Sequence, residues 1–233
     1  MKENEPRCEL DRLSFVYLRG GLVQMGTYRP IPCTLEGYRR NETPVRTIEV
    51  EPFWICRYKV TNLMFEAFKP HERAETSPSD ECPVTEITYG EVLSFIDWLN
   101  KDTGKHFRLP TEGEWCFAAA PFGQEYPHGN TPNFDAGHVH GDSLPRGALP
   151  VGDPRFPRNC YGLDQMGYNV SEMTQGMYYT EGHNGAETDG AYCIVKGGNW
   201  GHCKRGPRLA SRAIIDVADR NPRVGFRLAH DAK

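Results

Sequence analysis

The chain has 233 residues, of which 38% are hydrophobic and 25% charged, with a formal net charge of −4 at pH 7. This balance excludes disorder along the whole chain, and no apolar run approaches the roughly 18 residues of a membrane span. Mild acidity without a basic cluster argues against nucleic acid as the main partner. Glycine and proline together make up about 18% of the chain, against about 12% in average usage, so we expect many turns.

The N-terminal part of the chain predicts extended structure followed by a short helix. Residues 14–27 predict two short strands on either side of a Gly-Gly pair. Residues 45–58 predict a further extended stretch, although their alternation of polar and apolar residues is imperfect. A helix is expected over 61–69, where two phenylalanines precede a proline that ends it.

Two further helices begin with the Thr-x-x-Glu pattern of a capping box, at Thr88 and at Thr111. The first is expected over 88–101, where apolar residues recur at i, i+3, i+4 and i+7. The second is expected over 111–120.

The second half of the chain shows less periodicity. Residues 121–190 are rich in Gly, Pro, Asn and Asp and predict a long, loop-dominated region. Closing strands are expected at 191–198 and 223–229.

Eight cysteines are spread along the chain without a C-x-x-C pair, which disfavours a zinc ribbon or a thioredoxin-like site. The N-terminus lacks the apolar segment of a secretory signal. We therefore expect reduced, mostly buried thiols and a location in the cytoplasm or on the surface of a virion or similar particle. On a particle surface, a few disulfides would be compatible with the sequence.

Four segments, in their order and spacing, resemble the formylglycine-generating enzyme (sulfatase-modifying factor) family. They are Arg108-Leu-Pro-Thr-Glu-Gly-Glu-Trp115, Asn159-Cys-Tyr-Gly-Leu163 continuing to Asn169-Val-Ser-Glu172, Lys196-Gly-Gly-Asn-Trp200 and Gly225-Phe-Arg-Leu228. The resemblance extends over residues 1–233. It implies one α+β domain with a variant C-type lectin-like fold and little regular secondary structure.

The resemblance also shows where this chain departs from the oxidase members. Those enzymes bind copper through two cysteines five residues apart, just after the Gly-Gly-Ser-Trp/Tyr segment, because paired soft thiolates suit Cu(I). Here the corresponding segment, 200–208, contains Cys203 alone. We therefore expect no formylglycine generation and assign no catalytic residue.

Metal sites of other kinds stay open. An oxidase or oxygenase with altered chemistry would use a metal held by Cys203 or by the H-x-H pair His138 and His140. The resemblance also implies calcium, the one candidate cofactor, and no cofactor is required. The positions that match its oxygen ligands are Asn133, Asp153, Asn169 and Glu172, although Tyr168 replaces the glycine that precedes Asn169 in the family.

Residues 200–224 resemble the variable region of diversity-generating retroelement proteins, which share the lectin-like fold. Adenine mutagenesis there cannot convert an asparagine codon to Lys, Glu, Gln, Met or Trp. The segment 201–223 is here called the C-terminal strip, and it contains twelve candidate positions. None of the twelve carries one of these types. The twelve are Gly201, His202, Cys203, Gly206, Ser211, Ala213, Ile214, Ile215, Asp219, Asn221, Pro222 and Arg223.

This second resemblance predicts a ligand-binding display protein, phage- or virus-encoded, whose strip recognises a protein or glycan. Ile214 and Ile215 are expected in a loop, either partly buried or as an exposed contact patch. A third hypothesis is a structural homologue that assists a larger complex. The display hypothesis requires an exposed strip on an ordered backbone. The residues expected to hold that backbone are Trp200, Arg205, Arg208, Arg212, Arg220 and Phe226.

Overall fold

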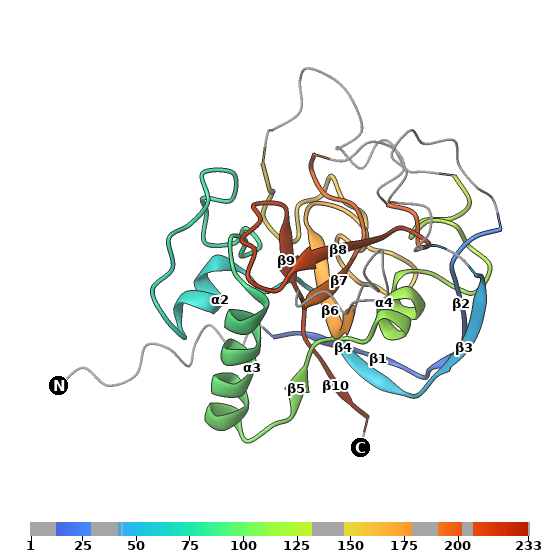
Figure 1. Ribbon diagram of the computed structural model, residues 1–233, viewed down its shortest axis with the longest axis horizontal. Helices are drawn as coiled ribbons and strands as arrows, with labels where there is room; N and C mark the ends of the chain where they lie inside the picture. The colour runs from blue at the N-terminus through green and yellow to red at the C-terminus, as the bar shows by residue number, and fades with distance from the viewer. Residues whose placement is uncertain are drawn as a thin grey trace, which may run out of the picture.

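The computed structural model describes residues 13–28, 42, 44–131, 147–178, 191–201 and 207–232. Short strands and three α-helices in these residues are joined by long irregular segments (Figure 1). This agrees with the α+β class and the low content of regular structure expected from the sequence. No described helix is long and apolar enough to cross a membrane.

The N-terminal strands form one long, bent, antiparallel ribbon. The strands are β1 (Phe15–Leu18), β2 (Gly21–Met25), β3 (Arg46–Val50) and β4 (Phe53–Cys56). β1 pairs with β4 and β2 with β3, and the register is continuous, with Leu18 opposite Phe53 and Gly21 opposite Val50. The two extended stretches predicted from the sequence are therefore confirmed, and they pair with each other across the bend.

Gly20 lies at this bend in a left-handed conformation, with φ of 72°. A Cβ atom at this position would lie 2.1 Å from the carbonyl oxygen of Val50. Only glycine combines the positive φ with this close approach of the opposite strand.

The first and last strands of the chain flank the same central strand. β4 lies between β1 and β10 (Ala229–Asp231), and β5 (Phe107–Arg108) completes a sheet of order β1-β4-β10-β5. The strands nearest the two termini are thus neighbours in space, as expected.

The three helices begin at the predicted residues. α2 (Asn62–Glu66), α3 (Tyr89–Thr103) and α4 (Glu112–Ala119) have threonines as N-caps, and both predicted capping boxes are present, on α3 and α4. α2 is shorter than expected: it ends at Glu66, and residues 67–69 form a turn before Pro70.

A second sheet has the strand order β8-β7-β6-β9. Its strands are β6 (Ser171–Tyr178), β7 (Tyr192–Lys196), β8 (Arg212–Asp216) and β9 (Val224–Phe226). β7 and β9 confirm the two predicted closing strands. The sequence did not predict β6, which lies in the loop-dominated region. It mixes Ser171, Glu172, Thr174 and Gln175 with two methionines, and its register is irregular between Met173 and Met177.

Two large hydrophobic clusters form most of the core, and Leu149, Phe156 and Tyr168 form a small third one. One joins α3 to the second sheet, where Phe95 contacts Phe226 edge-on at 5.7 Å between ring centroids. The other joins α4 to the N-terminal ribbon around the fully buried Trp115. The second sheet is therefore held on one face by α3, and its Lys196 reaches the ring of Trp115 at 5.8 Å.

The ribbon bend provides a direct test. Gly20→Ala should lower the free energy of unfolding by at least about 2 kcal/mol, because a left-handed backbone and a clash with Val50 act together. Gly104→Ala is the matched control, because Gly104 has φ of 68° but nothing within 4 Å of an added Cβ. It should cost only about 1 kcal/mol. Equal losses in urea titrations of the two variants would show that the close approach at Gly20 contributes nothing.

Candidate functional site

A fully buried lysine lies beneath the turn that leads to the strip. The Nζ atom of Lys59 donates to the backbone oxygens of Gln165 at 2.8 Å and Tyr168 at 3.1 Å. It also lies 3.2 Å from Oε1 of Glu172. Burial lowers the pKa of Lys59 to about 8, while Glu172 opposes that shift. The ammonium therefore links the turn 165–168 to strand β6.

Arg227 forms the other half of this buried network. Its guanidinium donates to both carboxylate oxygens of Glu172 and to the backbone oxygens of Cys56, Arg57 and Asp164. Burial alone would raise the pKa of Glu172, but Arg227 and Lys59 outweigh it and hold that pKa below its ordinary value. One carboxylate thus joins β4, β6 and the C-terminal segment.

The turn held by Lys59 positions the start of the strip. Asn169, with φ of 69°, accepts a hydrogen bond from Trp200 N at its backbone oxygen. Its side-chain amide donates to the backbone oxygen of Leu149 and to Oε1 of Gln165. Gly198 N donates to Gly167 O, so two backbone bonds fix the segment that ends at Trp200.

Arginine–carboxylate pairs hold the rest of the strip's backbone. Arg208 is buried and donates to both oxygens of Glu42 at 2.8 Å. Arg212 lies 3.1 Å from the carboxylate of Glu112 in α4. These pairs tie the strip to segments on the α4 side of the second sheet.

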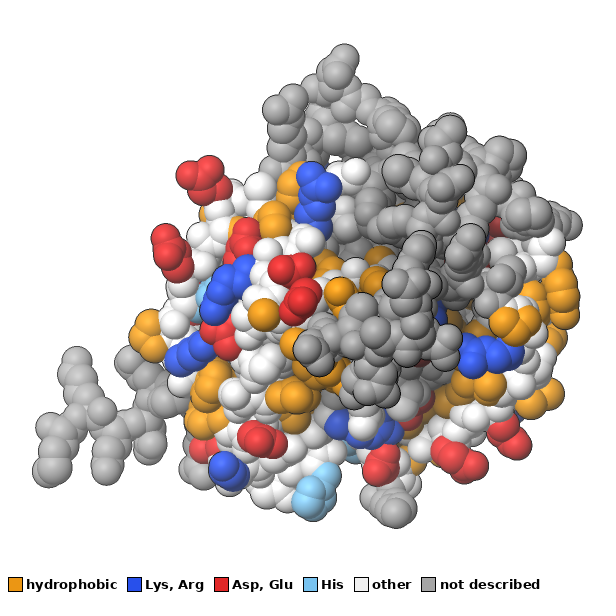
Figure 2. All heavy atoms as spheres, viewed as in Figure 1, with side chains coloured by type: hydrophobic (Ala, Val, Ile, Leu, Met, Phe, Trp, Pro, Cys, Tyr) orange, Lys and Arg blue, Asp and Glu red, His pale blue; other side chains and the backbone are white. Residues whose placement is uncertain are grey.

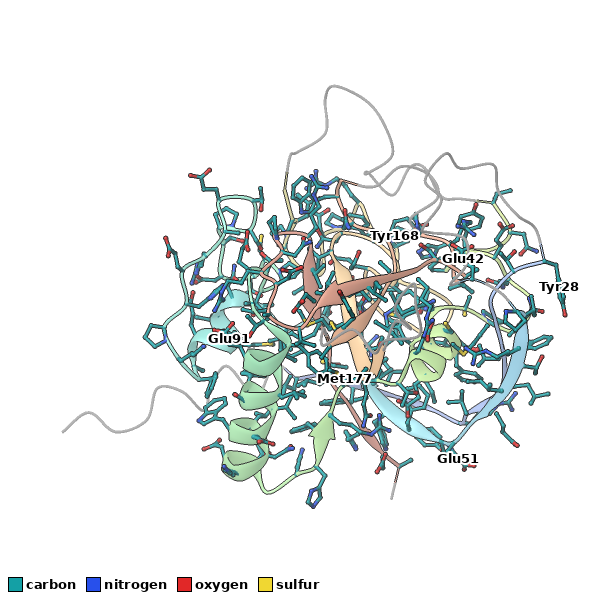
Figure 3. The ribbon with its side chains drawn as sticks, viewed as in Figure 1. Tyr28, Glu42, Glu51, Glu91, Tyr168 and Met177 are labelled. Atoms are coloured by element: carbon teal, nitrogen blue, oxygen red, sulfur yellow. The ribbon has the colours of Figure 1, made fainter. Side chains whose placement is uncertain are left out.

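Arg220 is exposed but bonded, and it ties the strip to α3. It donates to Glu86 O at 2.7 Å and contacts Glu91 at 2.9 Å. Glu91 also completes the capping box of α3, so one carboxylate serves both the helix and the strip. Glu91 and Glu42 lie on opposite sides of the second sheet in the view of Figure 3.

The described strip candidates are less buried than Arg208 and Phe226, whereas Arg212 and Arg220 differ from them by their ion pairs and not by burial. Of the described candidates none is buried: Gly201, Asp219 and Arg223 are exposed, and Ser211, Ala213, Ile214, Ile215, Asn221 and Pro222 are half-buried. Phe226 and Arg208 are buried, whereas Trp200 is only half-buried. His202, Cys203, Arg205 and Gly206 lie outside the described residues.

The two adjacent isoleucines are not in a loop. They belong to strand β8 and pair with β7, with Ile214 opposite Ile194 and Ile215 opposite Cys193. Because side chains alternate along a strand, they point to opposite faces. Ile215 packs, with Ala213, against the core cluster that contains α3. The expected loop is therefore wrong, while Ile215 is partly buried, which is one of the two expected alternatives, and Ile214 points away from that cluster.

The calcium candidates have other partners in the structure. Both oxygens of Glu172 accept from Arg227, and the side chain of Asn169 is bonded to Leu149 and Gln165. Asp153 pairs with Arg155 at 2.7 Å. Asn133, like His138 and His140, lies outside the described residues. In the part of the chain that is described, no three His, Cys, Asp or Glu side chains form a group able to hold a metal. Calcium binding stays a prediction.

The described cysteines are all free thiols, and all but the exposed Cys160 are buried, as expected. Burial raises the pKa of Cys56 and Cys116, and it raises the pKa of Cys193 to about 12. These three thiols are protonated at neutral pH and are poor nucleophiles and metal ligands.

Residues 1–232 match the sulfatase-modifying factor enzyme 1-like domain. The chain belongs to this family. It is 27% identical to the inactive C-alpha-formylglycine-generating enzyme 2 of Bos taurus, over 94% of this chain and 89% of the relative. It is 26% identical to the formylglycine-generating enzyme of Thermomonospora curvata, over 93% of each.

Solved structures with the same fold include PvdO from Pseudomonas aeruginosa and Treponema denticola variable protein 1. The first has a TM-score of 0.70 at 27% identity, covering 93% of this chain and 94% of that one. The second has a TM-score of 0.74 at 17% identity, covering 94% and 95%, and shows likeness of fold alone. The predicted family and lectin-like fold class are thus confirmed.

The buried network predicts a specific pH dependence. Glu172→Gln leaves two buried cations without their carboxylate and should cost about 3–5 kcal/mol at pH 7. Since the pKa of Glu172 is lower in the folded than in the unfolded protein, its stabilisation is present above about pH 4.3 and disappears as pH falls further. The difference in unfolding free energy between wild type and E172Q should therefore shrink as the pH falls below about 4.3.

Two variants control for this prediction. Glu51→Gln changes an exposed carboxylate and should leave the pH curve of stability unchanged. Lys59→Met in the E172Q background removes one of the two cations and should recover part of the lost stability. If the unfolding free energies of wild type and E172Q changed in parallel with pH, Glu172 would not be the charged partner of Lys59 and Arg227.

Proposed function

We propose that the protein is a ligand-binding display protein whose C-terminal strip recognises a protein or glycan ligand. The observation that carries this proposal is the contrast in burial within 201–227. Every described candidate position of the strip is at least partly exposed, while Arg208, Phe226 and Arg227 are buried and bonded or packed. Exposed side chains on a rigid scaffold are the usual arrangement of a recognition surface.

The same contrast makes the strip tolerant of substitution. Side chains that contribute little to packing can vary at little cost, usually within about 0.5 kcal/mol. The ion pairs of Arg208, Arg212 and Arg220 reach carboxylates outside the strip and hold much of its backbone. Of the described candidate side chains, Ala213 and Ile215 add packing and Asn221 adds a hydrogen bond to Arg223 N. Such tolerance is the property that a diversified surface requires.

Copper-dependent oxidation is the weaker hypothesis for this chain. The segment after Trp200 contains Cys203 alone, and the described thiols are mostly buried. Relatives in Bos taurus and Mus musculus carry the name of an inactive formylglycine-generating enzyme, in keeping with a family domain that serves without this chemistry.

Combined substitution tests the tolerance directly. Replacing Ile214, Asp219 and Arg223 together with Asn should change the unfolding free energy by no more than about 1.5 kcal/mol, at about 0.5 kcal/mol a site. Ile215 is left in place because it packs against the core. Phe226→Ala, the framework control, should cost about 3–5 kcal/mol. Unfolding of the triple variant at 25 °C would contradict the proposal.

The genomic locus tests the origin of the strip. A near-copy of the codons for 200–224, with adenines at the varied positions and a reverse transcriptase gene nearby, is the expected arrangement. A locus without such a copy, together with metal-dependent oxygen consumption by the protein, would favour the oxidase hypothesis instead.

Cu(I) titration separates the two hypotheses biochemically. The reduced protein should show no tight stoichiometric Cu(I) binding at Cys203, because one thiolate cannot provide paired soft ligation. Competition with a chelator of known affinity measures this. Tight binding that disappears in Cys203→Ala would overturn the expectation.

A further inference from the structure

One arginine of the strip differs from the other described arginines near it. Arg208, Arg212, Arg220 and Arg227 each bond a carboxylate of the fold. Among the residues that the structure describes, none accepts a hydrogen bond from the guanidinium of Arg223. Its Cζ instead lies 4.7 Å from the centroid of the Trp200 ring. Arg223 is therefore the one described strip arginine whose planar donor fork has no acceptor among the described residues.

The backbone on both sides holds this arginine in place. Arg223 N donates to Oδ1 of Asn221, and Arg223 O accepts from Ser171 N at the start of β6. The indole N–H of Trp200 donates to Pro222 O at 3.4 Å. The ring beneath the guanidinium is thus fixed relative to the chain that carries Arg223.

Gly201 provides the space that this arrangement needs. A Cβ atom there would lie 2.8 Å from Cζ and from Nε of Arg223. The guanidinium therefore lies against Gly201 as well as over the tryptophan ring. Gly201 is not in the left-handed region, so the restriction comes from Arg223 and not from the backbone conformation.

We propose that Arg223, held over the Trp200 ring beside Gly201, anchors the recognition surface and binds the carboxylate of an acidic side chain on a partner protein. This rests on the proposed function and specifies its ligand. A planar guanidinium donates two parallel hydrogen bonds to a carboxylate, and contact with the ring and with Gly201 restricts its orientation before binding. Arginine and tryptophan are also the residues that most often dominate the energy of protein interfaces.

Charge and polarity favour a protein over a polyanion. The chain has a net charge of −4, and the face seen in Figure 2 intersperses acidic, basic and hydrophobic side chains. A nucleic acid or a highly charged polysaccharide would be repelled by much of such a surface. Half-buried Trp200 and Pro222 beside the cation instead match a carboxylate bordered by apolar groups, as on a protein surface.

The test uses small probes of defined chemistry. The full chain is titrated with a blocked tetraglutamate peptide, a blocked tetraglutamine peptide and trigalacturonate at low salt. The NMR signals of the Arg223 Nε–H and the Trp200 indole N–H are followed. Tetraglutamate should shift both signals saturably and more weakly at high salt, whereas tetraglutamine should not.

Four variants locate the binding. Affinity for tetraglutamate should fall at least about tenfold in Arg223→Gln and about fivefold in Arg223→Lys, which keeps the charge but loses the planar fork. Gly201→Ala should also weaken binding with the fold retained, because its Cβ displaces the guanidinium. Arg46→Gln, at an exposed arginine of β3, is the matched control and should bind as wild type does.

Several results would overturn the proposal. These are no binding of tetraglutamate, equal binding by R223Q and wild type, equal binding by R223K and wild type, or no effect of G201A. Tighter binding of trigalacturonate than of tetraglutamate would overturn the choice of a protein partner. Failure here with a stable triple strip variant would leave the proposed function standing, whereas unfolding of that variant would remove the proposed function itself.

Discussion

The buried ammonium of Lys59 is the constraint on which the functional face depends. A charge in the interior must be neutralised and hydrogen-bonded, and Lys59 meets this requirement with Glu172 and two backbone oxygens of the turn 165–168. Arg227 shares the same carboxylate and brings the C-terminal segment to β4 and β6. The turn therefore has one arrangement that satisfies the cations, and through Asn169 it fixes where Trp200 lies.

The separation between support and display follows from this network. The strip follows Trp200, which the turn fixes, and ends just before β9, whose Val224 pairs in parallel with Ser171 of β6. Between these ends, arginines reach carboxylates of other segments, so the backbone depends mainly on these pairs and on the packing of Ala213 and Ile215. Arg223 differs from these arginines. Trp200 and backbone hydrogen bonds hold it in place, but no described carboxylate neutralises its charge.

Local sequence signals predicted the helices and the outer strands. Capping boxes at Thr88 and Thr111 fix helix starts within a few residues, so the sequence carries them directly. The sequence did not predict β6 because polar residues such as Glu172 and Thr174 are typical of a loop. Their burial depends on partners far along the chain, such as Ile194 for Thr174. Lys59 carried no signal at all, because a lysine between Tyr58 and Val60 is indistinguishable from a surface residue until Glu172 is placed beside it. The resemblance located the strip in the sequence. It did not predict strand β8, in which Ile214 and Ile215 point to opposite faces and Ile215 packs against the core, because β8 forms only by pairing with β7.

A protease-resistance scan of every single substitution over 199–228 tests the central claim most directly. The account predicts a sharp division. Substitutions at Arg208, Phe226 and Arg227 should lower the free energy of unfolding strongly, whereas most substitutions at Ser211, Ile214, Asp219 and Arg223 should leave it nearly unchanged. Ala213 and Ile215 should be intermediate, because they pack partly against the core. Equal sensitivity of strip and framework positions would contradict the separation of support from display.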